Sequence, residues 1–116
     1  MAQAAAPGAA FFVIKSRGSV AGCGGMGPLA GGNSEVCELR KMYFLTPLRG
    51  LGLGPRLLKM VLDAARKSGY KLCYLETLDH MVHARHLYQK HGFTMIDSPM
   101  GNTGHSACNS WMVKTL

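Results

Sequence analysis

The sequence predicts a single α/β domain with a mixed, mostly antiparallel sheet, a central parallel strand pair and flanking helices. Two observations carry this prediction. Strand-like runs at 11–15 and 20–26 are close enough for a tight turn, which makes them antiparallel neighbours. Farther along, a strand-like run at 35–45, an amphipathic run at 55–68 and a strand-like run at 70–77 follow one another. A strand, a helix and a strand in this order imply a parallel pair with a right-handed crossover.

The first strands have two features that depend on particular residues. Glycines at 22, 24 and 25 are unusual inside a strand. They predict a close backbone approach or a bulge, and a loosely packed edge is an equally open alternative. In the strand 35–45, side chains alternate between two faces. The alternation predicts one face with Glu38, Arg40, Met42 and Phe44, and another with Cys37, Leu39, Lys41 and Tyr43.

Two helices follow. The first opens at Pro55, whose missing N–H costs nothing in a first helical turn, and ends before Gly69, which suits a left-handed exit. Its apolar stripe, which we expect in the core, consists of Leu58, Val61, Leu62 and Ala65. The second helix is predicted to be capped by Asp79 and to close at Gly92. Strands at 93–97 and 107–113 complete the sheet.

Length and composition limit the class of protein. The 116 residues suffice for one core, so we expect a single domain over 1–116 with a flexible start over 1–10. Hydrophobic residues make up 47% and charged residues 16%, and no apolar run approaches the roughly 18 residues of a membrane span. The start lacks the features of a secretory signal. We therefore expect a cytoplasmic protein with no membrane partner.

Charge and metal-ligating residues argue against two further classes. The formal net charge is +7, but Lys and Arg are scattered without basic blocks, which argues against nucleic acid as a partner. The four cysteines form no C-x-x-C pair, so we expect reduced, mostly buried thiols. His83 and His86 lie one helical turn apart without an evident third donor, and we expect no metal site.

The stretch from Arg49 to Gly54 predicts an anion site. It reads Arg-Gly-Leu-Gly-Leu-Gly between a strand and the start of a helix. Backbone N–H groups at a helix start bind phosphate where glycines permit approach, and Arg49 and Arg56 add charge. A mononucleotide loop would end in Gly-Lys-Ser/Thr, whereas Pro55 and Arg56 follow here. A dinucleotide fingerprint would not space its three glycines by two throughout.

Two motifs in this order resemble the GNAT acetyltransferase superfamily. The stretch 49–54 is similar to Arg-x-x-Gly-x-Gly, the loop that holds the coenzyme A pyrophosphate in that family, and 84–93 resembles its Ala-x-x-Leu-Tyr-x-Lys-x-Gly-Phe helix. The resemblance covers about two thirds of the chain, from Glu35 onward. It implies the acyl-CoA N-acyltransferase fold, in which the central parallel strands splay apart and open a V-shaped cleft for the pantetheine arm.

The resemblance also implies acetyl-CoA as co-substrate and a set of residues around it. Backbone groups near the end of the strand 35–45 would pair with the cofactor, and amides around Phe44 and Leu45 would polarise the acetyl carbonyl. The residues implied on this strand are Met42, Tyr43, Phe44 and Leu45. Those implied for the pyrophosphate are Arg49, Gly50, Leu51, Gly52, Leu53, Gly54, Pro55 and Arg56.

Three side chains are candidates for catalysis. Tyr88 matches the motif tyrosine that protonates the departing thiolate. The alternative is a buried tyrosine with a purely structural role, whose hydroxyl only makes a hydrogen bond. By its distance from the pyrophosphate loop, Glu38 matches a glutamate used as a base in one branch of the family. Glu76, on the next strand, is a second candidate base. A solvated carboxylate, or one paired with Arg40, is the open alternative for Glu38.

The sequence says less about the residues that would bind the acceptor amine. The loop 98–106 is polar and glycine-rich, and it either lines the acceptor site or simply connects two strands. Met81 stands where many family members have an asparagine that contacts the cofactor. The chain begins at what resembles the family's second strand, so we expect its first strand and following two helices to be missing. A homodimer would cover the apolar surface that such a gap exposes.

Two functions follow from the resemblance. The first is an N-acetyltransferase that transfers the acetyl group of acetyl-CoA to a primary amine of a small molecule or to an exposed amino group by direct attack. The alternative is a truncated, catalytically weak form that binds acyl-CoA or another protein. The identity of the acceptor amine does not follow from the sequence.

Overall fold

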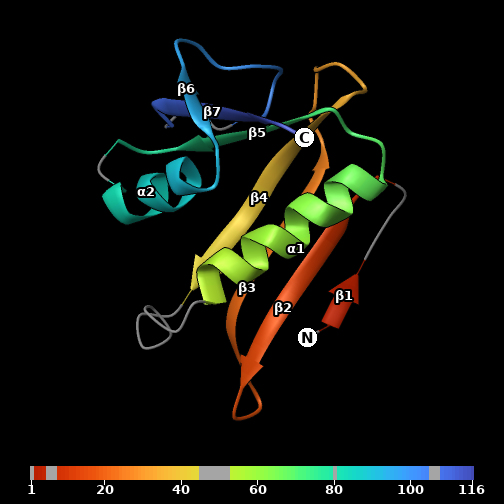
Figure 1. Ribbon diagram of the computed structural model, residues 1–116, viewed down its shortest axis with the longest axis vertical. Coiled ribbons are helices and arrows are strands. Elements are labelled where there is room, and N and C mark those ends of the chain that lie inside the picture. Colours follow the sequence, from red (N-terminus) through yellow and green to blue (C-terminus); the bar gives the residue numbers. More distant parts are fainter. Residues whose placement is uncertain (1, 5–7, 45–52, 80, 105–107) are drawn as a thin grey trace.

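The computed structural model describes residues 2–4, 8–44, 53–79, 81–104 and 108–116. They form one seven-stranded sheet in the order β1-β2-β3-β4-β5-β7-β6 with two helices (Figure 1). The elements are β1 Ala2–Ala4, β2 Ala10–Ser16, β3 Ser19–Pro28, β4 Val36–Phe44, α1 Leu53–Lys67, β5 Leu72–Thr77, α2 Val82–Lys90, β6 Thr94–Ile96 and β7 Ser110–Thr115. Among the described strands, only β4 and β5 pair in parallel. The predicted mixed α/β fold is confirmed.

The ends of several elements differ from the predicted ones. Residues 2–4 form a short edge strand paired with β2, an element that the sequence analysis did not include. The expected flexibility of residues 1–10 stays a prediction. Helix α1 begins at Leu53, two residues before Pro55, and β7 begins at Ser110 and continues to Thr115. Among the described residues, no helix is long and apolar enough to cross a membrane.

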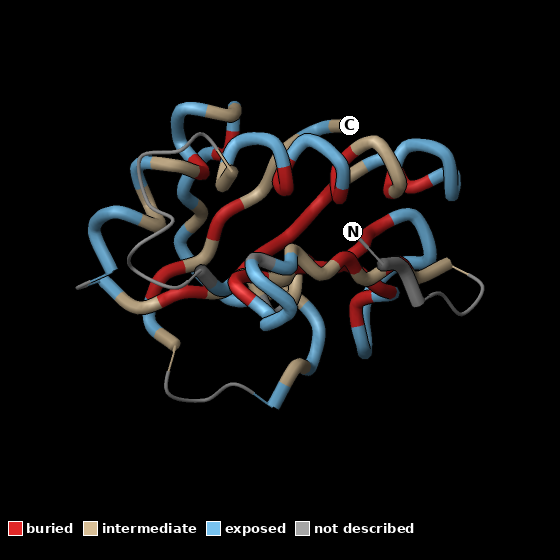
Figure 2. The backbone as a smooth tube through the Cα atoms, turned by 90° about the horizontal axis from the view of Figure 1, so that it is seen from below, coloured by how far each residue is buried: buried red, intermediate tan, exposed pale blue. Residues whose placement is uncertain are grey.

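Helix α1 packs across β2, β3 and β4 through one apolar side (Figure 2). All four residues of the predicted stripe are buried, and Leu57 joins them. After Lys67 the chain turns sharply at Gly69, whose φ is +90°, and the N–H of Tyr70 donates to the carbonyl of Ala65 at 3.2 Å. This left-handed exit is the one that the sequence predicted, because glycine adopts a positive φ without steric cost.

A bulge in β4 changes which side chains face α1. Cys23 pairs with Tyr43 and Gly25 with Arg40, so the two residues Lys41 and Met42 lie opposite the single residue Gly24. An extra residue reverses the alternation beyond it. Met42 therefore packs against the core under α1, together with Cys37 and Leu39. The predicted placement of Met42 on the face of Glu38 and Arg40 is wrong for this reason. The predicted glycine-associated bulge is confirmed.

The start of α2 also differs from its prediction. The N-cap residue is Met81, and no side chain among the described residues caps the helix. Asp79 accepts a hydrogen bond from the hydroxyl of Ser110 on β7 instead, and its backbone N–H donates to Asn109 at 2.9 Å. The predicted Asp79 cap is wrong because a strand distant in sequence binds this carboxylate. The helix closes before Gly92, as predicted, with a φ of +92° at that glycine.

Candidate active site

The two central strands pair only at their first residues and then separate. Register partners are Val36 with Leu72, Cys37 with Cys73, and Glu38 with Tyr74. No pairing between the described residues of β4 and β5 follows, although β5 stays paired with β7 as far as Thr77. Figure 1 shows the two strands running apart beyond this point. The facing backbone edges of β4 and β5 are therefore available to an extended ligand.

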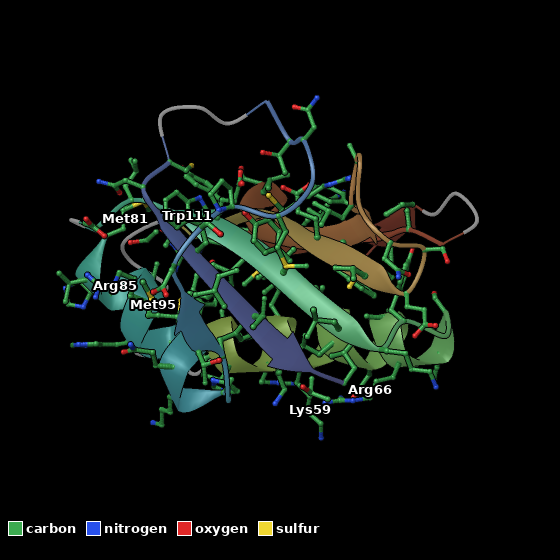
Figure 3. All side chains as sticks on the ribbon, turned by 90° about the horizontal axis from the view of Figure 1, so that it is seen from above. Lys59, Arg66, Met81, Arg85, Met95 and Trp111 are labelled. Carbon is green, nitrogen blue, oxygen red and sulfur yellow. The ribbon has the colours of Figure 1, made fainter. Side chains whose placement is uncertain are left out.

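Alternation along β4 and β5 gives this part of the sheet two different faces. We call the side covered by α1 the helix face; it carries Cys37, Leu39, Cys73 and Leu75. The opposite side, the loop face, carries Glu38, Tyr74 and Glu76 and is covered by residues 98–104. Figure 3 shows α1 on one side of the sheet and this segment on the other.

Tyr88 lies in the core on the helix face. It is 8% exposed, and its ring meets that of Phe93 edge to face, with centroids 5.7 Å apart. Burial, and then the neighbouring Cys73, raise the pKa of Tyr88 to about 12. The phenol is therefore protonated throughout the neutral range, as an acid must be before it donates a proton.

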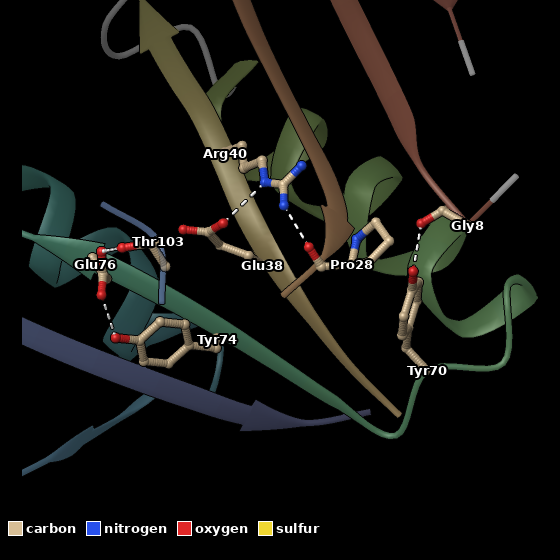
Figure 4. A network of polar contacts seen from close by, with 8 residues as sticks. All are labelled: Gly8, Pro28, Glu38, Arg40, Tyr70, Tyr74, Glu76 and Thr103. Carbon is tan, nitrogen blue, oxygen red and sulfur yellow. Dashed lines mark hydrogen bonds and ion pairs between the residues drawn. The ribbon is translucent and has the colours of Figure 1, made fainter. Parts of the chain in front are cut away.

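Glu38 lies on the loop face just where the strands separate. It is 4% exposed, and its Oε1 accepts a hydrogen bond from Nε of Arg40 at 2.9 Å. The same guanidinium donates to the carbonyl oxygen of Pro28 on β3 (Figure 4). The ion pair considered in the sequence analysis is thus present, and it fixes the carboxylate of Glu38 against the strand.

Glu76 is held by two hydroxyl groups on the same face. Its Oε2 accepts from Tyr74 at 2.6 Å and its Oε1 accepts from Thr103 at 2.5 Å (Figure 4). The backbone N–H of Met100 donates to the Tyr74 hydroxyl at 3.1 Å. Burial, followed by the bond to Glu76, raises the pKa of Tyr74 above its ordinary value. Segment 98–104 is therefore bound to β5 rather than being a simple solvated connection.

A hollow of about 250 Å³ lies between this segment and the sheet. Its described lining residues are Glu76, Pro99, Gly101, Asn102, Thr103, Gly104, Cys108 and Trp111. Burial, and then the negative charges of Glu76 and Glu38, raise the pKa of the Cys108 thiol. The carboxylates of Glu76 and Glu38 therefore both act on the thiol at this end of the loop face.

A second hollow, of about 400 Å³, follows the outer side of α1. It is lined by Pro55, Arg56, Lys59, Leu62, Asp63, Arg66 and His91. Three of these residues are basic, and Lys59 and Arg66 point outward along the helix in Figure 3. Arg66 also pairs with Asp63 at 3.1 Å. This hollow begins at the start of α1, where the predicted cofactor residues Pro55 and Arg56 are exposed.

Much of the predicted cofactor loop lies outside the described residues. This applies to Leu45, Arg49, Gly50, Leu51 and Gly52. Leu53, Gly54, Pro55 and Arg56 form the first turn of α1, which contains no acidic residue. On β4, Met42 is partly buried and Tyr43 is exposed. Phe44 is the last residue of the strand, and only its backbone is described.

The sequence analysis missed one pair of thiols. Cys37 and Cys73 are register partners and are fully buried on the helix face next to Tyr88. The interaction between the two thiols lowers the pKa of Cys37 and raises that of Cys73, and burial raises the pKa of Cys73 further. The two cysteines are 36 residues apart, so no local sequence pattern indicated this contact. Within the described part of the chain, no group of three or more His, Cys, Asp or Glu could hold a metal ion.

Comparisons with known proteins agree with this geometry. The model of the acetyltransferase (GNAT) family matches residues 2–93. An uncharacterized N-acetyltransferase of Escherichia coli, YjgM, is 46% identical over 110 residues, which make up 95% of this chain and 66% of the relative. The chain therefore spans just under two thirds of that relative's length.

Solved structures share the fold at lower identity. A GNAT-family acetyltransferase from Staphylococcus aureus matches with a TM-score of 0.84 and 24% identity, over 95% of this chain and 69% of that one. A GNAT-family acetyltransferase from Elizabethkingia anophelis, solved with acetyl-CoA bound, matches with a TM-score of 0.71 and 21% identity, over 94% of this chain and 77% of that one. With the family model covering most of its length, this chain belongs to the acetyltransferase (GNAT) family.

Proposed function

We propose that this domain transfers the acetyl group of acetyl-CoA to a primary amine by direct attack. The observation that carries the proposal is the separation of β4 and β5 after Glu38 and Tyr74, with a protonated phenol on the helix face and carboxylates on the loop face. Direct transfer needs a proton donor for the departing thiolate and a proton acceptor for the amine. The helix face would supply the proton donor, and the loop face would supply the proton acceptor.

The cofactor would lie between the separating strands. Its pantetheine arm is an extended amide chain, so it can pair with the backbone edge of β4 from Met42 to Leu45 as an added strand would. Amides near Phe44 and Leu45 would polarise the acetyl carbonyl. The residues 49–54 and the first turn of α1 would bind the pyrophosphate, with Arg56 supplying charge. The basic hollow along α1 supports this orientation, because it continues from Arg56.

Tyr88 would act as the acid. As the amine nitrogen bonds to the carbonyl carbon, the carbon–sulfur bond breaks, and the leaving thiolate takes the phenolic proton. The pKa of about 12 keeps the phenol protonated at neutral pH, so the proton is present when the thiolate leaves.

The amine must lose a proton before it attacks. Deprotonating an alkylammonium of pKa about 10.4 costs about 4.6 kcal/mol at pH 7. Glu38 is the base we favour, because it lies at the point where the strands separate. Its Oε1 accepts a hydrogen bond from Arg40. In the role of base, the carboxylate would take the proton directly or by way of one water molecule. Glu76 is the second candidate, on the same face.

The first experiment tests cofactor binding without requiring turnover. Ligand at a hundredfold its Kd should stabilise the protein by about 2.7 kcal/mol. We expect acetyl-CoA to raise the Tm of the wild type and to leave that of Gly52→Glu unchanged, because the substitution puts a negative charge beside the pyrophosphate. Ser68→Glu is the matched control, since it adds the same charge at the other end of the helix. It should keep the shift.

The second experiment separates the two candidate functions. A panel of primary amines is tested for release of free coenzyme A. Turnover that Tyr88→Phe abolishes supports the transferase. A normal acetyl-CoA shift without turnover of any amine supports the alternative, a form that binds acyl-CoA without catalysis. If the wild type gives no shift at all, both cofactor-dependent functions are wrong.

A further inference from the structure

We propose that the hollow on the loop face binds a second, non-reacting ammonium group of the acceptor, so that the substrate is a small amine with two cationic nitrogens. The proposal rests on the proposed acetyl transfer and names its substrate class. The site consists of the carboxylate of Glu76 and the indole of Trp111, with Thr103 and Tyr74 orienting the carboxylate.

Sheet register brings the carboxylate and the indole together. Glu76 and Trp111 are direct partners in the antiparallel pair of β5 and β7, so their side chains leave the same face of the sheet side by side. Both line the hollow. A carboxylate beside an indole suits an ammonium ion, because one supplies a charged acceptor and the other a cation–π contact.

The electrostatics of the hollow select for positive charge. Glu76 is the only charged residue among its described lining residues. Glu38 adds a second carboxylate on the same face, and both charges are felt at Cys108. The guanidinium of Arg40 is bound to Glu38 and to the carbonyl of Pro28, away from Glu76 (Figure 4). An anionic acceptor would meet repulsion here.

The group bound by Glu76 should not be the amine that reacts. A carboxylate beside an amine stabilises its protonated form, whereas attack on a thioester needs the neutral form. Two hydroxyl groups fix Glu76 in place, which suits permanent binding of a charged group. The reacting nitrogen would then lie toward the gap between β4 and β5, because Glu76 is on the part of β5 that has separated from β4.

Size restricts the acceptor further. Sites for drug-sized ligands usually enclose about 300 to 1,000 Å³. The hollow, at about 250 Å³, suits one end of a short aliphatic chain rather than a folded protein segment. A linear diamine places one ammonium in the hollow and leaves the other nitrogen free to reach the cofactor.

The test compares two amines with the same four-carbon chain, 1,4-diaminobutane and butylamine. Calorimetry is performed on the protein saturated with coenzyme A, so that binding is measured without chemistry. We expect the diamine to bind at least tenfold more tightly, since a hydrogen bond to a charged group corresponds to about tenfold to hundredfold in affinity. Equal affinities for the two amines would overturn the proposal.

Variants then assign the preference to the hollow. Glu76→Gln should bring the ratio of kcat/KM for diamine over monoamine close to one, chiefly by raising the KM for the diamine. Trp111→Leu should lower the same ratio severalfold. Glu35→Gln is the matched control, because Glu35 is an exposed carboxylate outside the hollow, and it should keep the wild-type ratio.

The outcomes separate this proposal from the proposed function. A diamine preference in calorimetry that Glu76→Gln removes, without any turnover, sustains the ammonium site and refutes acetyl transfer. Turnover with the same ratio in wild type and Glu76→Gln refutes the ammonium site and leaves acetyl transfer in place. An equal fall of kcat for both amines in Glu76→Gln would make Glu76 the base instead.

Discussion

The helix face and the loop face of β4 and β5 are built from alternate residues of the same two strands, yet they differ in almost every physical property. The helix face is apolar and closely packed, and even its titratable groups, Cys37, Cys73 and Tyr88, are buried there. The loop face carries two carboxylates, an ion pair and a hollow. The difference matches the two tasks we propose: one face would hold the acid in a fixed, dry place, and the other would offer charge to an incoming substrate.

The largest expected effect tests the catalytic task of the helix face. Tyr88→Phe removes the proposed acid, and proton transfer of this kind typically contributes about 10²-fold to 10⁴-fold to rate. We expect kcat to fall by that factor, measured as coenzyme A release at saturating amine. Tyr70→Phe is the control. It removes the hydroxyl of another buried tyrosine, which donates to the carbonyl of Gly8 at 2.6 Å, and kcat should be retained. Equal losses in the two variants would contradict the assignment.

The next effect tests the packing of the same face. Leu57→Ala empties a fully buried position under α1, where a large-to-small change typically costs about 2–5 kcal/mol. Urea unfolding should show that loss. Met60→Ala, one turn farther on the outer side, should change the free energy of unfolding by less than about 0.5 kcal/mol. Similar losses at both positions would mean that α1 does not pack through this side.

The sequence predicted the helix face better than the loop face, and the reason is the range of the interactions. The stripe of α1 and its exit at Gly69 follow from periodicity and glycine chemistry within a few residues. The partners on the loop face come from distant segments. Thr103 reaches Glu76 across 27 residues, and Trp111 meets Glu76 through strand register, which no local pattern encodes.

The errors have the same origin. Simple alternation along β4 assigns Met42 to the right face only if the strand has no inserted residue. The bulge opposite Gly24 inserts one, and it depends on how β3 pairs with β4. Asp79 had the chemistry of a helix cap, but Ser110 on β7 binds it. Local propensity was overruled by tertiary contacts in both cases. The family resemblance made Tyr88 and Glu38 candidates, Tyr88 by its motif and Glu38 by its distance from the loop, because a family pattern records the outcome of long-range packing that single residues do not.

A smaller effect tests how firmly the loop face is held. Tyr74→Phe removes a hydroxyl that donates to Glu76 and accepts from the N–H of Met100. Losing these two hydrogen bonds, one of them to a carboxylate, should cost about 1–3 kcal/mol in unfolding. Hydrogen exchange should quicken at the Met100 amide while the amides of α1 keep their protection. Unchanged exchange at Met100 would mean that the Tyr74 hydroxyl does not help to hold this segment.

The smallest effect tests the dryness of the helix face by titration. The pKa of Tyr88 is raised from 10 to about 12, because burial disfavours the phenolate. Below pH 10 the phenol is protonated in both the folded and the unfolded state, so it adds no pH dependence. Between pH 10 and 12 the unfolded chain loses the proton first, and stability falls, by about 1.4 kcal/mol at pH 11. Urea unfolding at pH 9 and pH 11 should show a smaller alkaline loss in Tyr88→Phe than in the wild type, by about this amount. Equal losses would mean that the hydroxyl of Tyr88 reaches water in the folded protein, and the contrast between the two faces would then reduce to charge without a difference in solvent access.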